Sequence, residues 1–137
     1  MKKKTFYVLI MSIIWFVAGL SCNKTEMSGG NSSDIIGEWK LVKVIIPFTG
    51  ETYDYSQFNI SYNFNKNAVL SVSGKTDHIQ WYGGHETGEY SYSIIKDESG
   101  FILKINNRSY GCHISSKKLE ISDAPLDGFI YYLEKIN

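Results

Sequence analysis

Residues 58 to 64 read Phe-Asn-Ile-Ser-Tyr-Asn-Phe, with an apolar side chain at every second position. Successive side chains of a strand point to opposite faces, so an extended backbone gives this segment one apolar and one polar face. A helix would spread the same residues around its circumference. The segment therefore predicts a half-buried β-strand.

The same alternation recurs along the chain between short turn sequences. We predict strands at 39–46, 58–64, 68–72, 79–82, 90–94, 101–105, 110–114, 119–121 and 129–133, joined by hairpin turns at 65–67, 73–75, 97–100, 106–108 and 116–117. Helical periodicity is nearly absent, and we expect at most a turn before Trp39 or near 123–127. Sequential hairpins with one apolar face favour an all-β fold, a single antiparallel up-and-down barrel of eight or nine strands, because closure buries that face and removes the sheet edges. A two-sheet β-sandwich is the alternative.

Aromatic residues make up 15% of the chain. An eight-stranded barrel has room for its own side chains or for one small ligand. We expect a largely filled interior, with any pocket shallow, open at the loop end and edged by phenol hydroxyls. The aromatic residues in phase with the inner faces are Phe58, Tyr62, Phe64, Tyr90, Tyr92, Phe101, Tyr110, and Phe129 or Tyr131.

Residues 1–21 have the organisation of a secretory signal: three lysines, an apolar run, and small residues before Cys22. The apolar run is too short for a typical membrane-spanning helix. Gly19-Leu20-Ser21-Cys22 resembles a bacterial lipobox, although the usual leucine three residues before the cysteine is replaced by Gly19. The resemblance implies that Cys22 is lipidated. An ordinary secretory signal that leaves a free thiol is the alternative.

The chain therefore divides into a lipoprotein signal peptide (1–21), a lipidated cysteine with a flexible Gly- and Ser-containing tether (22–33), and one β-barrel domain (34–137). We expect the protein in the cell envelope of a Gram-negative bacterium, attached to the outer membrane through the lipid. The full chain has 14 basic and 14 acidic residues, and loss of the three signal lysines leaves a net charge of −3. Neither balance suggests binding to nucleic acid.

Gly37-Glu38-Trp39, at the start of the first predicted strand, resembles the Gly-x-Trp signature of lipocalins, and the meander that follows is similar to lipocalin-like domains of bacterial lipoproteins. The resemblance implies that Gly37 and Trp39 form a structural plug at one barrel end. Two departures are the short chain, which lacks an obvious helix before its end, and the missing arginine after the last strand. Lys135 is expected to replace that arginine by a cation–π contact with Trp39.

The sequence carries no catalytic motif: it lacks a Gly-x-Ser-x-Gly elbow, a His-Glu-x-x-His pair, a P-loop and a dinucleotide fingerprint. Asp77, His78, His85 and Glu86 crowd one segment, but a solvated loop is the favoured reading over a metal site. Cys112 is in phase with an inner face and is expected to be a buried, inert thiol, with His113 on the opposite face. We therefore expect no enzymatic activity, no metal and no cofactor.

Two long connections, 47–56 and 75–88, carry aromatic side chains that suit binding of a small molecule, a glycan or a protein. The candidate ligand-binding residues are Phe48, Tyr53, Tyr55, Trp81, Tyr82, Tyr90 and Tyr92. The favoured function is a membrane-anchored, non-catalytic module that binds a small amphipathic or sugar-like ligand at the open barrel end. The alternative is a surface module that contacts a protein or polysaccharide through loop aromatics, with a filled barrel as scaffold.

Overall fold

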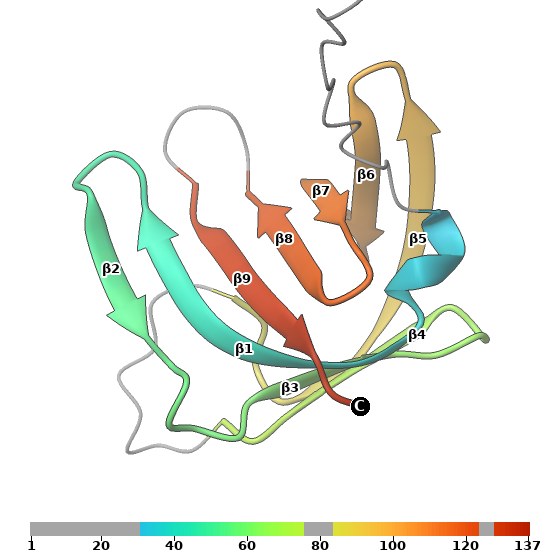
Figure 1. Ribbon diagram of the computed structural model, residues 1–137. Coiled ribbons are helices and arrows are strands. Elements are labelled where there is room, and N and C mark those ends of the chain that lie inside the picture. Colours follow the sequence, from blue (N-terminus) through green and yellow to red (C-terminus); the bar gives the residue numbers. More distant parts are fainter. Residues whose placement is uncertain (1–30, 76–83, 124–127) are drawn as a thin grey trace, which may run out of the picture.

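The computed structural model describes residues 31–75, 84–123 and 128–137. Within these residues, a 3-10 helix precedes nine antiparallel strands, eight of which form a closed barrel, with one additional strand beside it (Figure 1). The elements are η1 (Ser32–Ile35), β1 (Gly37–Ile46), β2 (Glu51–Asp54), β3 (Ser61–Phe64), β4 (Val69–Ser73), β5 (Gly88–Asp97), β6 (Gly100–Ile105), β7 (Arg108–Ile114), β8 (Lys118–Ser122) and β9 (Ile130–Lys135). The predicted all-β, up-and-down barrel is confirmed, as is the turn of helix before Trp39.

Strand β1 closes the barrel. One edge of β1 pairs with β9, and its other edge pairs first with β3 and then with β2. Because β2 and β3 follow one another along the same edge of β1, the closed ring consists of eight strands, and β2 is an extension beside it. A register shift between Leu41 and Lys43 marks a bulge where β1 faces β9.

Strand β2 corrects the prediction that residues 47–56 form one long loop. Residues 47–50 are a tight turn, closed by a hydrogen bond from the Gly50 amide to the Ile46 carbonyl, and residues 51–54 pair with β1. The side chains of β2 are mostly exposed, so the segment has no apolar alternation for the sequence to reveal. The predicted strand at 58–64 begins only at Ser61, although Ile60 is already buried in the core.

Strand β4 pairs directly with β5. The connection between them therefore runs from residue 74 to 87 and is longer than the hairpin turn predicted at 73–75. The predicted strand at 79–82 lies outside the described residues. The turns predicted at 65–67, 97–100, 106–108 and 116–117 all fall between paired neighbouring strands.

In an up-and-down barrel, successive connections alternate between the two ends. Residues 47–50, 74–87, 106–107 and 123–129 share one end, here called the loop end. The other end holds η1 and the shorter turns, and is here called the η1 end. Figure 1 shows η1 and the β1–β2 hairpin on opposite sides of the barrel.

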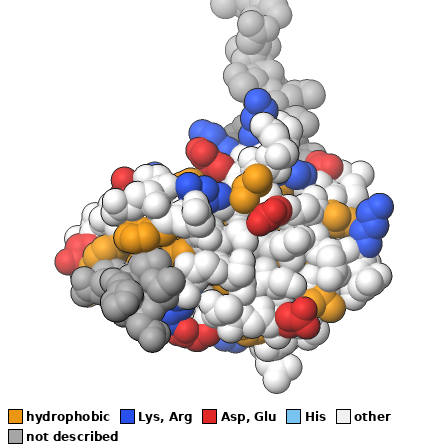
Figure 2. Space-filling model, turned by 90° about the horizontal axis from the view of Figure 1, so that it is seen from below, with side chains coloured by type: hydrophobic (Ala, Val, Ile, Leu, Met, Phe, Trp, Pro, Cys, Tyr) orange, Lys and Arg blue, Asp and Glu red, His pale blue; other side chains and the backbone are white. Residues whose placement is uncertain are grey.

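Alternate residues of the strands are buried in the barrel interior, as predicted. Five of the expected inner aromatics are buried, and Phe58, Tyr90, Tyr92 and Phe129 pack against them as partly buried neighbours. The five are Tyr62, Phe64, Phe101, Tyr110 and Tyr131. On the outer face seen in Figure 2, hydrophobic side chains form separate groups among charged ones. Among the residues that the structure describes, the large hydrophobic ones that stay exposed are Phe48, Ile95 and Ile136.

Trp39 is completely buried at the η1 end. Its indole Nε1 donates a hydrogen bond of 2.7 Å to the Ile35 carbonyl, which joins η1 to the first strand. The Lys135 ammonium lies 5.0 Å from the indole ring centroid, the contact expected for it, and donates to the Asp34 carbonyl at 3.1 Å. Gly37 has a φ of +126°, and a Cβ there would lie 3.2 Å from Lys135 Cε, so both conformation and space favour glycine.

Candidate functional site

Four tyrosines and one histidine gather at the loop end and form what we call the phenol cluster: Tyr62, His85, Tyr90, Tyr110 and Tyr131. The tyrosines come from β3, β5, β7 and β9. No two of these strands pair with each other, so their side chains meet only inside the barrel. His85 comes from the connection between β4 and β5. Strand alternation points each tyrosine inward, and the closed ring brings three of the side chains to His85 and the fourth, Tyr131, to the adjacent Gly84.

The His85 imidazole has three tyrosine rings around it. Ring centroids lie 6.1 Å away for Tyr62, 5.1 Å for Tyr90 and 5.5 Å for Tyr110, with tilted or edge-to-face geometry. The His85 Nε2 atom is 3.3 Å from the Tyr110 hydroxyl, within hydrogen-bonding distance. His85 is half-buried, whereas the sequence predicted that it lies in a solvated loop.

Hydrogen bonds tie the His85 segment to the tyrosines. The Gly84 amide donates to the Tyr131 hydroxyl at 2.9 Å, and the His85 amide donates to the Tyr62 hydroxyl at 3.3 Å. The Tyr90 hydroxyl donates to the Glu86 carbonyl at 2.8 Å. The phenol hydroxyls therefore act as both donors and acceptors toward one short stretch of backbone.

The cluster disfavours charge. Burial lowers the pKa of His85, an effect that the nearby Arg108 guanidinium reinforces and the Asp123 carboxylate opposes. Burial raises the pKa of Tyr62, Tyr110 and Tyr131, so these phenols stay protonated at neutral pH. The result is a neutral, hydrogen-bonding environment.

An ion pair borders the cluster. The Arg108 guanidinium donates to the Asp123 carboxylate at 2.7 Å, which links the start of β7 to the residue after β8. The same guanidinium lies 5.8 Å from the centroid of the Tyr110 ring. Arg108 is largely exposed, so this pair forms a polar rim around the more buried phenols.

The residues predicted to bind ligand lie in different places. Tyr90 belongs to the phenol cluster. Phe48 is 80% exposed in the β1–β2 turn, and Tyr55 is buried in the core. The Tyr53 hydroxyl donates to Glu51, and the Tyr92 hydroxyl donates to the Asn65 carbonyl at the η1 end. Trp81, Tyr82 and Cys22 lie outside the described residues.

Sequence reasoning assigned Tyr62, Tyr110 and Tyr131 only to the core and did not select His85. The period-two pattern does place each tyrosine inside, but it cannot reveal that their hydroxyls meet. The Gly83-Gly84-His85 sequence offered a weak signal, since glycines allow a close approach of backbone to the barrel.

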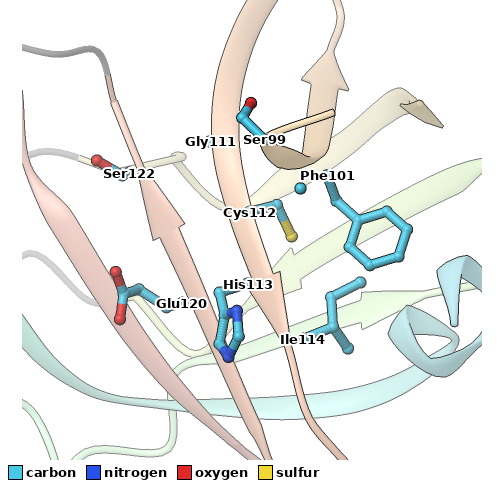
Figure 3. Close-up of a pocket in the computed structure, with 9 residues that line it drawn as sticks. Ser99, Phe101, Gly111, Cys112, His113, Ile114, Glu120 and Ser122 are labelled. Atoms are coloured by element: carbon cyan, nitrogen blue, oxygen red, sulfur yellow. The ribbon is translucent and has the colours of Figure 1, made fainter. Parts of the chain in front are cut away.

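A hollow of about 280 Å³ lies elsewhere, over β6, β7 and β8. Figure 3 shows Phe101, Cys112 and Ile114 on one side of β7, with Glu120 and Ser122 carried by β8. Cys112 is buried and its exposed neighbour His113 faces the other way, as predicted. Burial, with a contribution from the Glu120 charge, raises the pKa of the Cys112 thiol to about 12, which makes it a poor nucleophile at neutral pH.

Among the described residues, no group of three or more His, Cys, Asp or Glu side chains is placed to hold a metal ion. His113 and Glu120 occupy facing positions on β7 and β8, but two ligands make an incomplete site. In the same part of the chain, the structure contains no helix long and apolar enough to cross a membrane.

No family model, curated protein or solved structure matches the chain. The barrel is therefore established by its own strand pairing. The lipocalin and lipobox resemblances stay predictions from the residues that suggested them.

Proposed function

We propose that this protein is a membrane-anchored, non-catalytic, lipocalin-like module that binds a small amphipathic or sugar-like molecule at its loop end. The observation that carries the proposal is the convergence of four phenols and an imidazole at one end of a closed barrel. Apolar side chains are sufficient to fill the interior of a barrel. Buried polar groups are costly unless they are hydrogen-bonded, so polar groups in the interior call for an explanation. Polar groups clustered at one end suit a ligand with both rings and oxygens.

A thermal-shift screen of the full chain against lipids, flavonoid-like aromatics and oligosaccharides tests ligand binding. A ligand at about 100 times its Kd should stabilise the folded protein by about 2.7 kcal/mol, and the effect should saturate. Tyr131→Phe and His85→Ala should weaken the effect, whereas the matched control Tyr92→Phe, outside the cluster, should keep it. A screen in which no compound stabilises the protein would contradict the proposal.

Membrane anchoring rests on Cys22, which would carry a diacylglyceryl group after signal cleavage. Two acyl chains hold a protein on a bilayer much more firmly than one. Intact-mass spectrometry of protein extracted from membranes should show the lipid mass on a chain that begins at Cys22. Cys22→Ser should release the protein into the soluble fraction, and an unmodified N-terminus in the wild type would rule out the anchor.

A surface interaction module is the second candidate function, and Phe48 favours it. This side chain is 80% exposed in the turn between β1 and β2, where it contributes little to the core. Exposed aromatic side chains are common anchors of protein contacts. Pull-down from envelope extracts with wild type and Phe48→Ser should recover a partner only with the wild type, and equal recovery would exclude this turn as the contact.

A further inference from the structure

Tyr62 and Tyr131 have hydroxyl groups whose hydrogen-bonding capacity is only half used. Each hydroxyl oxygen accepts one backbone N–H, from His85 and Gly84 respectively. A phenol also has a hydrogen to donate. Within residues 31–75, 84–123 and 128–137, neither hydroxyl hydrogen has an acceptor. Both side chains are buried, with residue exposures of 1% and 4%.

Buried donors of this kind are costly. Leaving a buried polar hydrogen without an acceptor sacrifices the hydrogen bonds it made to water in the unfolded chain. The two hydroxyls accept the amides of adjacent residues, so both face the same short stretch of backbone. Gly84 has a φ of +88°, a conformation that favours glycine and that turns the backbone at this point of the cluster.

The surroundings of the two hydroxyls disfavour a charged ligand. The facing titratable groups are the phenols of Tyr90 and Tyr110 and the His85 imidazole, with Arg108 and Asp123 paired at the rim. Burial favours the uncharged forms of Tyr62 and Tyr131 and the neutral form of His85. An anionic ligand would lose its hydration without meeting an unpaired cation among these residues.

We propose that the loop-end site selects an uncharged ligand whose carbonyl or hydroxyl oxygen accepts the free hydroxyl hydrogens of Tyr62 and Tyr131. This inference rests on the proposed function and specifies its ligand class. The aromatic rings around His85 would contact the apolar part of the ligand. Selectivity follows because an analogue without the oxygen leaves both donors unpaired.

Three small probes of one shape separate the contributions: acetophenone, which has a neutral acceptor, ethylbenzene, which has none, and benzoate, which is anionic. Binding to the ¹⁵N-labelled full chain is followed by the amide shifts of Gly84 and His85, whose N–H groups contact the two phenols. We expect acetophenone to bind at least about tenfold more tightly than ethylbenzene, equal to about 1.4 kcal/mol, and more tightly than benzoate.

Tyr62→Phe and Tyr131→Phe should each reduce the preference for acetophenone over ethylbenzene, and the double variant should abolish it. Tyr92→Phe is the matched control and should keep the preference, because its hydroxyl bonds to the Asn65 carbonyl outside the cluster. Dispersed amide spectra show that each variant is folded.

Equal affinities for acetophenone and ethylbenzene at these amides would mean that water alone satisfies the hydroxyls, and would overturn the inference while leaving loop-end binding intact. Tightest binding by benzoate would overturn it too. Failure of all three probes to shift the two amides would contradict loop-end binding itself, and with it the proposed function.

Discussion

The two ends of the barrel are built from different chemistry. At the η1 end, a fully buried indole has apolar neighbours and one cation above its ring, and its single N–H is satisfied by the backbone. At the loop end, buried tyrosine rings carry hydroxyls, and among the described residues the hydroxyl hydrogens of Tyr62 and Tyr131 find no acceptor. The difference teaches that the η1 end is fully satisfied, whereas the loop end gives up some stability by keeping hydroxyl donors that, under the proposed function, a ligand would use.

The largest expected effect is at the η1 end. Trp39→Ala should lower the free energy of unfolding by about 3–5 kcal/mol, because it leaves a large cavity and removes the bond to Ile35. Tyr131→Phe, which deletes only a hydroxyl at the loop end, should cost about 1 kcal/mol or less. Urea denaturation measures both values. Equal losses would contradict the division of roles between the two ends.

A smaller effect is expected from the cation over the indole. Lys135→Met should destabilise the protein by about 1 kcal/mol, since it loses the cation–π contact with Trp39 and the hydrogen bond to the Asp34 carbonyl. Lys104→Met, on an exposed position of β6, should change stability by about 0.5 kcal/mol or less. Identical urea midpoints for the two variants would show that Lys135 does not support the η1 end.

The loop end should instead respond to pH. Because the pKa of folded His85 lies below its ordinary value of 6.5, the unfolded chain binds a proton more readily over the interval between the two values. This contribution to stability is complete above pH 6.5 and is lost as the pH falls through that interval. His85→Gln should therefore show a smaller drop in urea midpoint between pH 7.5 and 5.5 than the wild type. His113→Gln, on the exposed face of β7, is the control and should drop as the wild type does.

The smallest effect on stability is expected at the β1–β2 turn, whose exposed side chain belongs neither to the core at the η1 end nor to the phenol cluster. Phe48→Ser should alter the free energy of unfolding by no more than about 0.5 kcal/mol, because the side chain is already exposed. Thermal unfolding of the two proteins measures the difference. A loss above about 1 kcal/mol would mean that the exposed ring packs against the barrel in solution.

Much of the fold could be predicted because one physical rule decides it. Strands that face a core on one side must alternate, and Tyr62, Phe64, Leu103 and Cys112 follow that rule and are buried. Strand β2 was not predicted because its extended backbone depends on pairing with β1. Its side chains show no alternation of buried and exposed residues that the sequence could reveal. Local sequence carries no record of such pairing.

The site was harder to predict than the fold. Tyr62, Tyr90, Tyr110 and Tyr131 each lie on a different strand, and only the closed ring brings their hydroxyls to the segment 84–86. Alternation predicts which face a tyrosine takes, but it does not predict its height in the barrel or its hydrogen-bond partner. His85 was misjudged for the same reason, since its neighbours are remote in sequence.

The pairing of β1 with β9 also has a kinetic consequence. Leu41 faces Leu133 across this seam, so the two strands that complete the ring are separated by most of the described chain. Contacts between residues distant in sequence form slowly, because the chain loses the conformational entropy of a long loop before the contact contributes any stabilising energy. The hairpins between adjacent strands can form locally, and we expect the pairing of β1 with β9 to form last. Until then, β1 and β9 each expose an edge that another chain could join.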